Sequence, residues 1–420
     1  MIFKNKVQVA AVCAALAVVW GGCEYPYSPV RQAQPGVPTT GMLRSINAEL
    51  QTCNPSVSQD TSNFPACMLF LNLGEGELSV KVPPAWSSAY PLTGITQHDR
   101  LTIVDTGNTV KWFMKKPTFI SKEFQDPEWS THPDYIAVLG VRDDRLTGRP
   151  VKADNWSSAY AVKISTKQML RLFNDSLQAF STPHLWLPDA APAASIDYTA
   201  TATLFNETFV YNGDSSGAVD KATIQSFFGT TSVKVVYNFY SSAGRTGTSI
   251  YFIDYSQSTP VVTELRKPGG REDWTCESPL ISPDGEWVVY NCMAPDGQTW
   301  ASYVQKLDAT SEAIMVCAQA SDPHWFKYPD GSFGIVYDDK KWNPINAVPD
   351  KFIEDNMDGK LGSTYLLSAG DLSTLLPGAL PAVNFRNGAT VLLRLPFQGG
   401  YSRDGRFLVT GYRKAYIYMF

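Results

Sequence analysis

Three polar residues occupy one recurring position of this chain, directly after a proline, and could together bind a metal ion. Glu128 stands in "DPEW", His184 in "TPHLW" and His324 in "DPHW". Two imidazoles and a carboxylate suit several transition metals. Leu280 and Gly400 fill the same position in two further copies. The alternative interpretation, which we favour, is that these are polar residues near strand ends, hydrogen-bonded or solvated. We therefore predict no metal and no cofactor.

A serine in a glycine-rich segment is the second candidate for chemistry. The segment "GDSSG" (213–217) matches G-x-S-x-G, the pattern of a tight turn that exposes a nucleophilic serine, here Ser215. Such a turn belongs on a parallel sheet with helices between the strands, and nothing else in the sequence predicts that sheet. We interpret Ser215 as part of a Gly/Ser turn, and no catalytic residue is predicted.

The segment "EDNMDG" (354–359) resembles half of a calcium-binding loop. Glu354, Asn356 and Asp358 stand at alternate positions before a glycine. The twelfth position of the loop is Tyr365, where a calcium loop uses a bidentate glutamate. We interpret this segment as an acidic insertion between two strands.

Two cysteines bracket a hairpin in "CESPLISPDGEWVVYNC", which begins at Cys276 and ends at Cys292. The sequence Pro-Asp-Gly between two apolar runs predicts a three-residue hairpin loop in which Ser282 faces Glu286. That register also places the two cysteines opposite each other, about 4.5–5.5 Å apart at Cβ. We predict a disulfide between Cys276 and Cys292, as expected in an exported protein.

The remaining cysteines allow one more disulfide. Cys53 and Cys67 flank "NPSVSQDTSNFPA", and we predict that they close this segment into a loop. Cys317 is then left without a partner on an expected outermost strand, where a buried thiol is the simplest interpretation.

The hairpin unit recurs along the chain. Copies with a proline, an aromatic residue and a turn are followed in most cases by two further β-prone segments, so each repeat predicts about four antiparallel strands. Four-stranded units repeated along a chain are typical of propeller blades. The clearest copies lie at residues 126–140, 276–292, 321–339 and 395–412.

These repeats resemble the TolB-like (PD40) β-propeller family, whose pattern is of the type P-x-W-S-P-D-G-x-x-I-A-F. The match is clearest at Pro279 to Tyr290, Pro323 to Tyr337 and Pro127 to Leu139. The resemblance implies an all-β fold with the Pro-x-Trp segment as the innermost strand of each blade. Some propellers of this family are polysaccharide lyases with a histidine-bound metal at the channel mouth.

The number of blades follows from counting innermost strands. We place these strands near residues 85, 128, 184, 227, 280, 324 and 400, which predicts seven four-stranded antiparallel blades, with six as the alternative. Residues 68–82 would supply an N-terminal strand that closes the ring. A β-sandwich is the competing fold.

The N-terminal segment predicts export. Two lysines precede a short apolar run, and "GGC" then resembles the lipobox of bacterial lipoproteins, in which the cysteine, here Cys23, is acylated after cleavage. Trp20 departs from that pattern, so an ordinary secretory signal is the alternative. We expect a signal peptide over residues 1–22, a Pro/Gly-rich tether over 23–65 and the propeller over 66–420, on a protein lipid-anchored in the outer membrane.

Composition limits the function. The formal net charge is −5 and no basic patch stands out, which argues against nucleic acid as a partner. Without an assembled catalytic motif, we predict a binding or scaffold module for an envelope protein or polysaccharide. The alternative is a glycan-active lyase or hydrolase with its site at the channel mouth.

Overall fold

The computed structural model describes the greater part of the chain. The described residues are 42–46, 52–142 except 75, 156–173, 179–188, 209–210, 218–318 except 242–243 and 298, 320–327, 333–339, 364–367, 390–393, 407–410 and 415–419. All of them belong to the compact unit Pro38–Phe420. No helix in this described part is long and apolar enough to cross a membrane.

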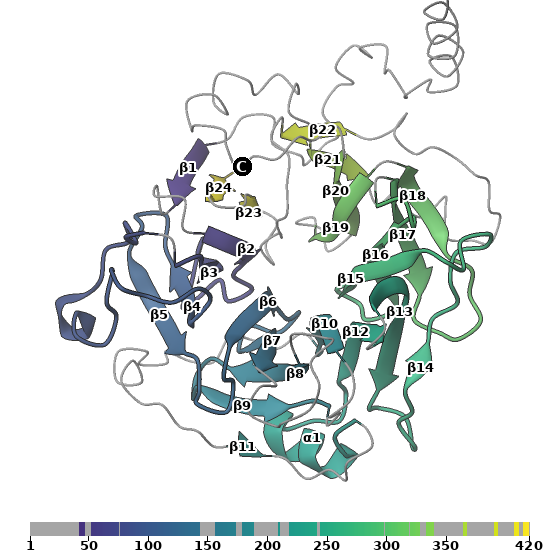
Figure 1. The fold of residues 1–420 in the computed structure, drawn as a ribbon, viewed down its shortest axis with the longest axis horizontal. Coiled ribbons are helices and arrows are strands. Elements are labelled where there is room, and N and C mark those ends of the chain that lie inside the picture. Colours follow the sequence, from purple (N-terminus) through teal and green to yellow (C-terminus); the bar gives the residue numbers. More distant parts are fainter. Residues whose placement is uncertain are drawn as a thin grey trace, which may run out of the picture. The chain divides into compact units, whose positions relative to one another are not determined.

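Four antiparallel sheets of four strands form the regular blades of the fold (Figure 1). The first contains β2 (Thr52–Val57), β3 (Met68–Asn72), β4 (Arg100–Val104) and β5 (Val110–Lys115). The second contains β10 (Ala179–Trp186), β12 (Lys234–Ser241), β13 (Gly244–Asp254) and β14 (Thr263–Glu264). The third contains β15 (Thr275–Ile281), β16 (Trp287–Met293), β17 (Trp300–Lys306) and β18 (Ile314–Ala318). The fourth contains β19 (Ala320–Lys327), β20 (Phe333–Asp339), β21 (Thr364–Leu367) and β22 (Thr390–Leu393).

Two further sheets depart from this form. One contains β6 (Glu123–Trp129), β7 (Tyr135–Arg142), β8 (Trp156–Lys163) and β9 (Gln168–Arg171), and the short β11 (Phe209–Val210) adds a parallel fifth strand beside β9. The other has three strands, in the order β1 (Met42–Ile46), β24 (Ala415–Met419) and β23 (Phe407–Thr410). The N-terminal strand β1 therefore pairs with the C-terminal strand β24.

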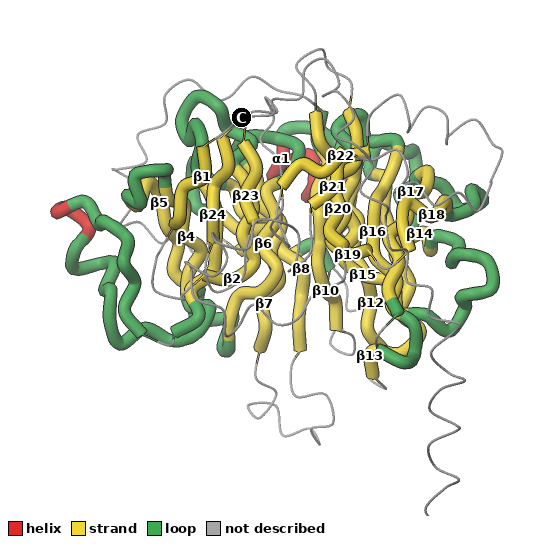
Figure 2. Tube along the Cα trace, turned by 90° about the horizontal axis from the view of Figure 1, so that it is seen from above, coloured by secondary structure: helices red, strands yellow, loops and turns green. Residues whose placement is uncertain are grey.

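The sheets follow one another around a common centre, so the described residues form a β-propeller. The innermost strands β2, β6, β10, β15 and β19 contact one another in chain order, and β2 also contacts β23. Figure 1 shows these strands nearest the centre, with later strands of each sheet further out. In Figure 2 the strands run side by side, and the described loops lie mostly at their ends.

The structure corrects the predicted propeller in its number of blades. Seven four-stranded blades, or six, were expected, but only four sheets of the described residues have this form. The expected innermost strand near residue 85 is instead the 3₁₀-helix η1 (Pro84–Trp86), and that near 227 is α1 (Lys221–Phe228). The expected strand near residue 400 lies outside the described residues.

Local sequence signals explain why these two segments form helices and not innermost strands. Helix η1 has a proline in its first turn, which suits a helix start. Helix α1 has Asp220 as N-cap, whose side chain accepts from the N–H of Thr223, and Gly229 as a left-handed C-cap. An aspartate before the apolar run and a glycine after it were readable helix boundaries.

The expected closing strand and tether are also corrected. Residues 68–72 form β3, the second strand of the first blade, and the strand that joins the C-terminal sheet is β1. Strands β1 and β2 both lie inside the segment 23–65, which was expected to be an extended tether. The first strand of the described residues thus begins at Met42; residues 1–41 lie outside them.

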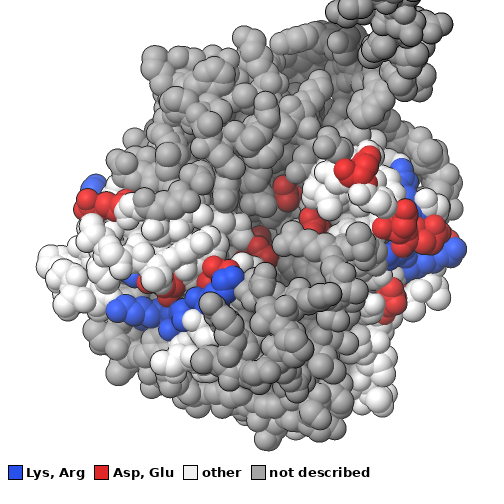
Figure 3. Space-filling model, viewed as in Figure 1, with Lys and Arg blue, Asp and Glu red and all other residues white. Residues whose placement is uncertain are grey.

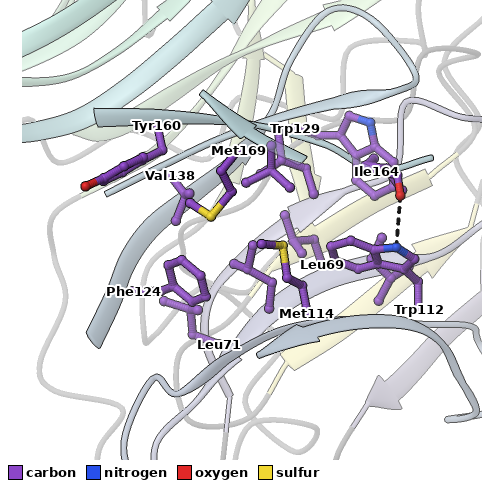
Figure 4. Close-up of a cluster of buried hydrophobic side chains, with 14 of the residues drawn as sticks. Leu69, Leu71, Trp112, Met114, Phe124, Trp129, Val138, Tyr160, Ile164 and Met169 are labelled. Atoms are coloured by element: carbon purple, nitrogen blue, oxygen red, sulfur yellow. Dashed lines mark hydrogen bonds between the residues drawn. The ribbon is translucent and has the colours of Figure 1, made fainter. Parts of the chain in front are cut away.

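Apolar side chains fill the space between neighbouring sheets. Every residue of β3 is buried, because the next sheet covers one face of its blade and residues 78–95 cover the other. Figure 4 shows one such layer, in which Trp112 of β5 and Met114 pack with Trp129 and Tyr160 of the next sheet. The Trp112 Nε1–H donates to the backbone carbonyl of Ile164 at 3.1 Å, which satisfies its only polar atom.

The predicted Cys276–Cys292 disulfide is confirmed, although the predicted register beside the turn is wrong. Ser282 pairs with Trp287, not Glu286, through an N–H···O bond of 2.8 Å, so the hairpin loop has four residues. A β-bulge between Glu277 and Leu280 then adds one residue to β15 and shifts the register back. The two cysteines consequently face each other and are joined.

Candidate functional site

Five innermost strands carry the same local distortion. Each contains a residue in the left-handed region, with φ between 41° and 56°, followed by a proline, and each has a register shift at that point. Proline lacks the N–H that a sheet ladder uses, so it fits a bulge. The five segments are Asn54-Pro55-Ser56 in β2, Asp126-Pro127-Glu128 in β6, Thr182-Pro183-His184 in β10, Ser278-Pro279-Leu280 in β15 and Asp322-Pro323-His324 in β19.

These bulges line one pocket, which we call the central pocket. It has a cavity volume of about 70 Å³ and opens to solvent. Its lining comes from all five bulges and includes the carboxylates of Asp126, Glu128 and Asp322. Figure 3 shows acidic atoms in the hollow at the middle of the visible face. The repeated bulge thus turns equivalent residues of separate sheets towards a common space.

Side chains at the bulges also join neighbouring strands. The residue before the proline does so twice: Asn54 Nδ2 donates to Asp126 Oδ1, and Thr182 Oγ1 accepts from the N–H of Ser278 at 3.1 Å. The residue after the proline also joins two neighbouring strands. Ser56 Oγ accepts from the N–H of Trp129 at 3.0 Å.

His184 makes the corresponding contact from β10. Its Nδ1 accepts from the N–H of Ile281 at 3.1 Å, and its ring also interacts with the backbone of Trp129. Burial, together with the neighbouring His324, lowers the pKa of His184 to about 3. His184 is therefore a neutral, buried link between strands.

Glu128 and His324 meet across the central pocket. Glu128 Oε1 lies 3.7 Å from His324 Nε2, and Glu128 Oε2 accepts from Ser56 Oγ at 2.8 Å. Burial opposes protonation of His324, but the nearby Glu128 carboxylate, with a smaller contribution from Asp322, outweighs it and raises the pKa of His324. The structure thus brings two of the three predicted polar residues together as a carboxylate–imidazole pair.

The structure gives no support to a metal centre at these residues. His184 directs Nδ1 to a backbone N–H, so this nitrogen is not available as a ligand. No group of three or more His, Cys, Asp or Glu side chains within the described residues could hold a metal ion.

The second expected disulfide, between Cys53 and Cys67, is not formed in the structure. Antiparallel pairing of β2 with β3 places Cys53 opposite Leu71, whereas the carbonyl of Cys67 accepts from the N–H of Ser58. The two cysteines therefore lie at opposite ends of one strand pair. Both are buried, and burial raises the pKa of the Cys67 thiol far above its usual value.

Other predicted features fall outside the described residues or at their margin. Cys23, Ser215 and the segment 354–359 lie outside them. Cys317 lies, as expected, on the outermost strand of its sheet, β18.

Sequence reasoning missed the residues before the prolines. Asp126 and Asp322 were quoted within the repeats but given no role, and Asn54-Pro55-Ser56 was assigned to a loop at the end of the tether. A shared signal was present, because all five segments have the form polar residue, proline, variable residue. Its weakness is the irregular spacing between copies, which long insertions cause.

Comparisons with known proteins identify no family. No known family matches the chain, and no curated protein matches it. Among solved structures, an alpha-L-arabinanase from Penicillium chrysogenum complexed with arabinobiose is 12% identical, covering 90% of this chain and 98% of that chain with a TM-score of 0.46.

Two further solved structures are similar at this level. An oligogalacturonate lyase in complex with manganese is 10% identical, covering 91% of this chain and 97% of that chain, TM-score 0.39. The microbial sialidase Hz136 is 8% identical, covering 89% of this chain and 66% of that chain, TM-score 0.41. A shared fold does not define an activity or a substrate.

Proposed function

We propose that this protein is an exported, lipid-anchored β-propeller that binds a glycan in the central pocket. The observation that carries the proposal is the lining, which combines the amide of Asn54, hydroxyl groups of Thr182 and Ser278, three carboxylates and the imidazole of His324. This set offers both donors and acceptors, as sugar hydroxyl groups require.

Backbone strain at the pocket supports a functional role. Five residues before prolines adopt positive φ, and Thr182 at φ 41° is the most unusual because its side chain is β-branched. Strained conformations cluster at binding sites, where the surrounding structure holds them in place. Here the strain coincides with the lining of the pocket.

Export and anchoring are supported by the sequence around Cys23 and by the Cys276–Cys292 disulfide. Structural disulfides form in oxidising compartments. The disulfide connects the two inner strands of a blade, and one of these strands lines the central pocket. The resemblance of the repeats to TolB-like propellers agrees with a place in the cell envelope.

The binding proposal is tested with the mature chain carrying Cys23→Ser, which prevents acylation. An array of neutral, amino and uronic acid oligosaccharides identifies ligands, and calorimetry then measures affinity. Asp322→Asn should weaken binding at least about tenfold, because hydrogen bonds to charged groups contribute roughly 1.5–3 kcal/mol. Asparagine adopts positive φ readily, so the backbone at this position should be retained.

A matched control variant tests whether the loss of affinity is specific to the central pocket. Asp273 is exposed, lies between β14 and β15 and does not line the central pocket. Asp273→Asn should therefore leave affinity unchanged. If no oligosaccharide binds, or if both variants bind as the parent does, the proposal fails.

A glycan-active enzyme is the second candidate. Glycoside hydrolysis uses a pair of carboxyl groups beside the scissile bond, and the central pocket has Asp126, Glu128 and Asp322 in its lining. Release of reducing ends from the bound oligosaccharide, abolished in Asp322→Asn or Glu128→Gln, would establish this activity. Binding without product release would instead favour the binding module.

A further inference from the structure

The Glu128–His324 pair connects strands that are not neighbours. Strand β6 contacts β2 and β10, whereas β19 contacts β15. Figure 1 shows β6 and β19 on opposite sides of the centre. The 3.7 Å separation of Glu128 Oε1 and His324 Nε2 therefore spans the central pocket from one side to the other.

Both partners are held in place by contacts near their own ends of the pair: Glu128 by a residue of the neighbouring strand β2, and His324 by its own strand. Glu128 receives the hydroxyl of Ser56, and that hydroxyl in turn accepts from the N–H of Trp129. His324 Nδ1 lies 3.0 Å from the backbone carbonyl of Asp322. A carbonyl oxygen can only accept, so Nδ1 must carry the hydrogen.

This orientation decides which protonation state suits the pair. With its hydrogen on Nδ1, a neutral imidazole presents a bare lone pair at Nε2 to the Glu128 carboxylate, which is repulsive. A protonated imidazole presents an N–H there and keeps its bond to Asp322. Only the imidazolium therefore makes a favourable contact across the pocket.

We propose that Glu128 and His324 form a pH-dependent latch across the central pocket, closed when His324 is protonated and released when it is neutral. In the closed state, Glu128 is occupied by the imidazolium and is not available to a ligand. In the released state, the Oε1 atom of Glu128 faces the pocket without the imidazolium, while Oε2 keeps its bond to Ser56. The effect on a ligand rests on the binding function proposed above, whereas the latch itself does not.

The charges around His324 favour its protonated form and therefore the closed state. Glu128 faces it from β6 and Asp322 from its own strand, and Asp126 lines the same pocket. His324 helps to lower the pKa of the nearby His184 of β10, and burial keeps His184 neutral. Strands β15 and β17 also contact β19. Their charged residues Glu277 and Lys306 do not line the central pocket.

A double-mutant cycle on the full mature chain, without ligand, tests the latch. Unfolding equilibria are measured for the parent, Glu128→Gln, His324→Gln and the double variant at about pH 6 and about pH 9. At about pH 6, the interaction should change the unfolding equilibrium constant by roughly tenfold, which lies within the range of coupling energies measured for residues in contact. At about pH 9 the favourable coupling should disappear, because the imidazole is neutral.

A second His–Glu pair in the same chain provides the control. His98 Nδ1 lies 3.8 Å from Glu123 Oε2, nearly the same separation, but burial lowers the pKa of His98 to about 4. A cycle with Glu123→Gln and His98→Gln should show the same coupling at both pH values. Equal pH dependence in the two cycles would overturn the latch, as would absence of coupling at about pH 6.

A titration of the folded parent protein covers the case in which a variant does not fold. The chain has four histidines, so single His→Gln variants assign their ring signals in NMR spectra. The His324 ring should titrate above the ordinary histidine value and fall in Glu128→Gln. A His324 signal that titrates at or below the ordinary value would refute the latch, whatever the outcome of the glycan array.

Discussion

The Nδ1 atom of His184 on β10 accepts a hydrogen bond from the backbone N–H of Ile281 on β15, at 3.1 Å. Strands β10 and β15 belong to different sheets and share no ladder of backbone hydrogen bonds. The His184 side chain therefore connects the two strands. The same arrangement recurs where Ser56 of β2 accepts from Trp129 of β6. The innermost strands are therefore connected by side chains that take the place of ladder hydrogen bonds.

Replacement of His184 by leucine should destabilise the protein. Leucine removes the acceptor and leaves the N–H of Ile281 buried without a partner, which costs about 1–3 kcal/mol. His184→Asn keeps an acceptor near the position of Nδ1 and should therefore lose less stability than His184→Leu. Urea unfolding of both variants measures the difference; equal losses would contradict the role of the hydrogen bond.

His184 should also make the protein sensitive to acid. Its pKa is lowered to about 3 in the folded state by burial and by His324, while the unfolded chain has the ordinary value of 6.5. The unfolded state therefore gains a proton first as pH falls, and stability is lost below about pH 6.5. Between about pH 8 and pH 5 the loss from this group is about 2 kcal/mol. Comparing the pH dependence of the unfolding free energy of the parent with that of His184→Asn should isolate the contribution of His184. Parallel pH profiles of the two proteins would disprove this contribution.

The sequence predicts the all-β class and the four-stranded blade, because turn and strand signals are local. It predicts the blade number poorly. Residues near 85 and 227 have the aromatic and apolar character of inner strands but form helices. A proline favours the helix start near residue 85. Asp220 and Gly229 favour the two ends of the helix near residue 227. Irregular insertions between blades remove the regular spacing that would expose such errors.

The candidate site could be predicted only in part. Glu128 and His324 were placed at equivalent positions by the residue that precedes them, and the structure brings them together. Asp126 and Asp322 were overlooked because their role depends on a bulge, which adds one residue to a strand and rotates its side chains. A bulge is set by pairing with the next strand, not by local propensity.

The disulfide between Cys276 and Cys292 should contribute to stability. It closes a loop with a sequence separation of 16, for which loss of unfolded-state entropy stabilises by about 3 kcal/mol. A Cys276→Ala/Cys292→Ala variant should therefore unfold at lower denaturant concentration. Reductant should lower the stability of the parent and leave this variant unchanged. Mass spectrometry that finds both thiols alkylated without prior reduction would contradict the bond.

Two glycines in equivalent turns should respond differently to substitution by alanine. Gly285 and Gly297 each end a Pro-Asp-Gly sequence, with φ of 77° and 67°, and each N–H bonds back to the residue three before it. A Cβ at Gly285 would lie 2.5 Å from the Trp186 ring, whereas one at Gly297 would meet nothing within 4 Å. Gly297→Ala should cost about 1 kcal/mol, the strain of a left-handed alanine. Gly285→Ala should cost about 2–4 kcal/mol, because Trp186 must also shift within a packed interface between two sheets.

Chemical denaturation of these two variants separates the backbone contribution from the packing contribution. Trp186 also donates from Nε1 to the carbonyl of Pro283, so its displacement should alter tryptophan fluorescence in Gly285→Ala alone. Equal destabilisation by both substitutions would show that the turn of β15 and β16 does not pack on β10 as described. A larger loss for Gly285→Ala would establish that this turn holds the neighbouring blade in place, and with it the strand that carries His184.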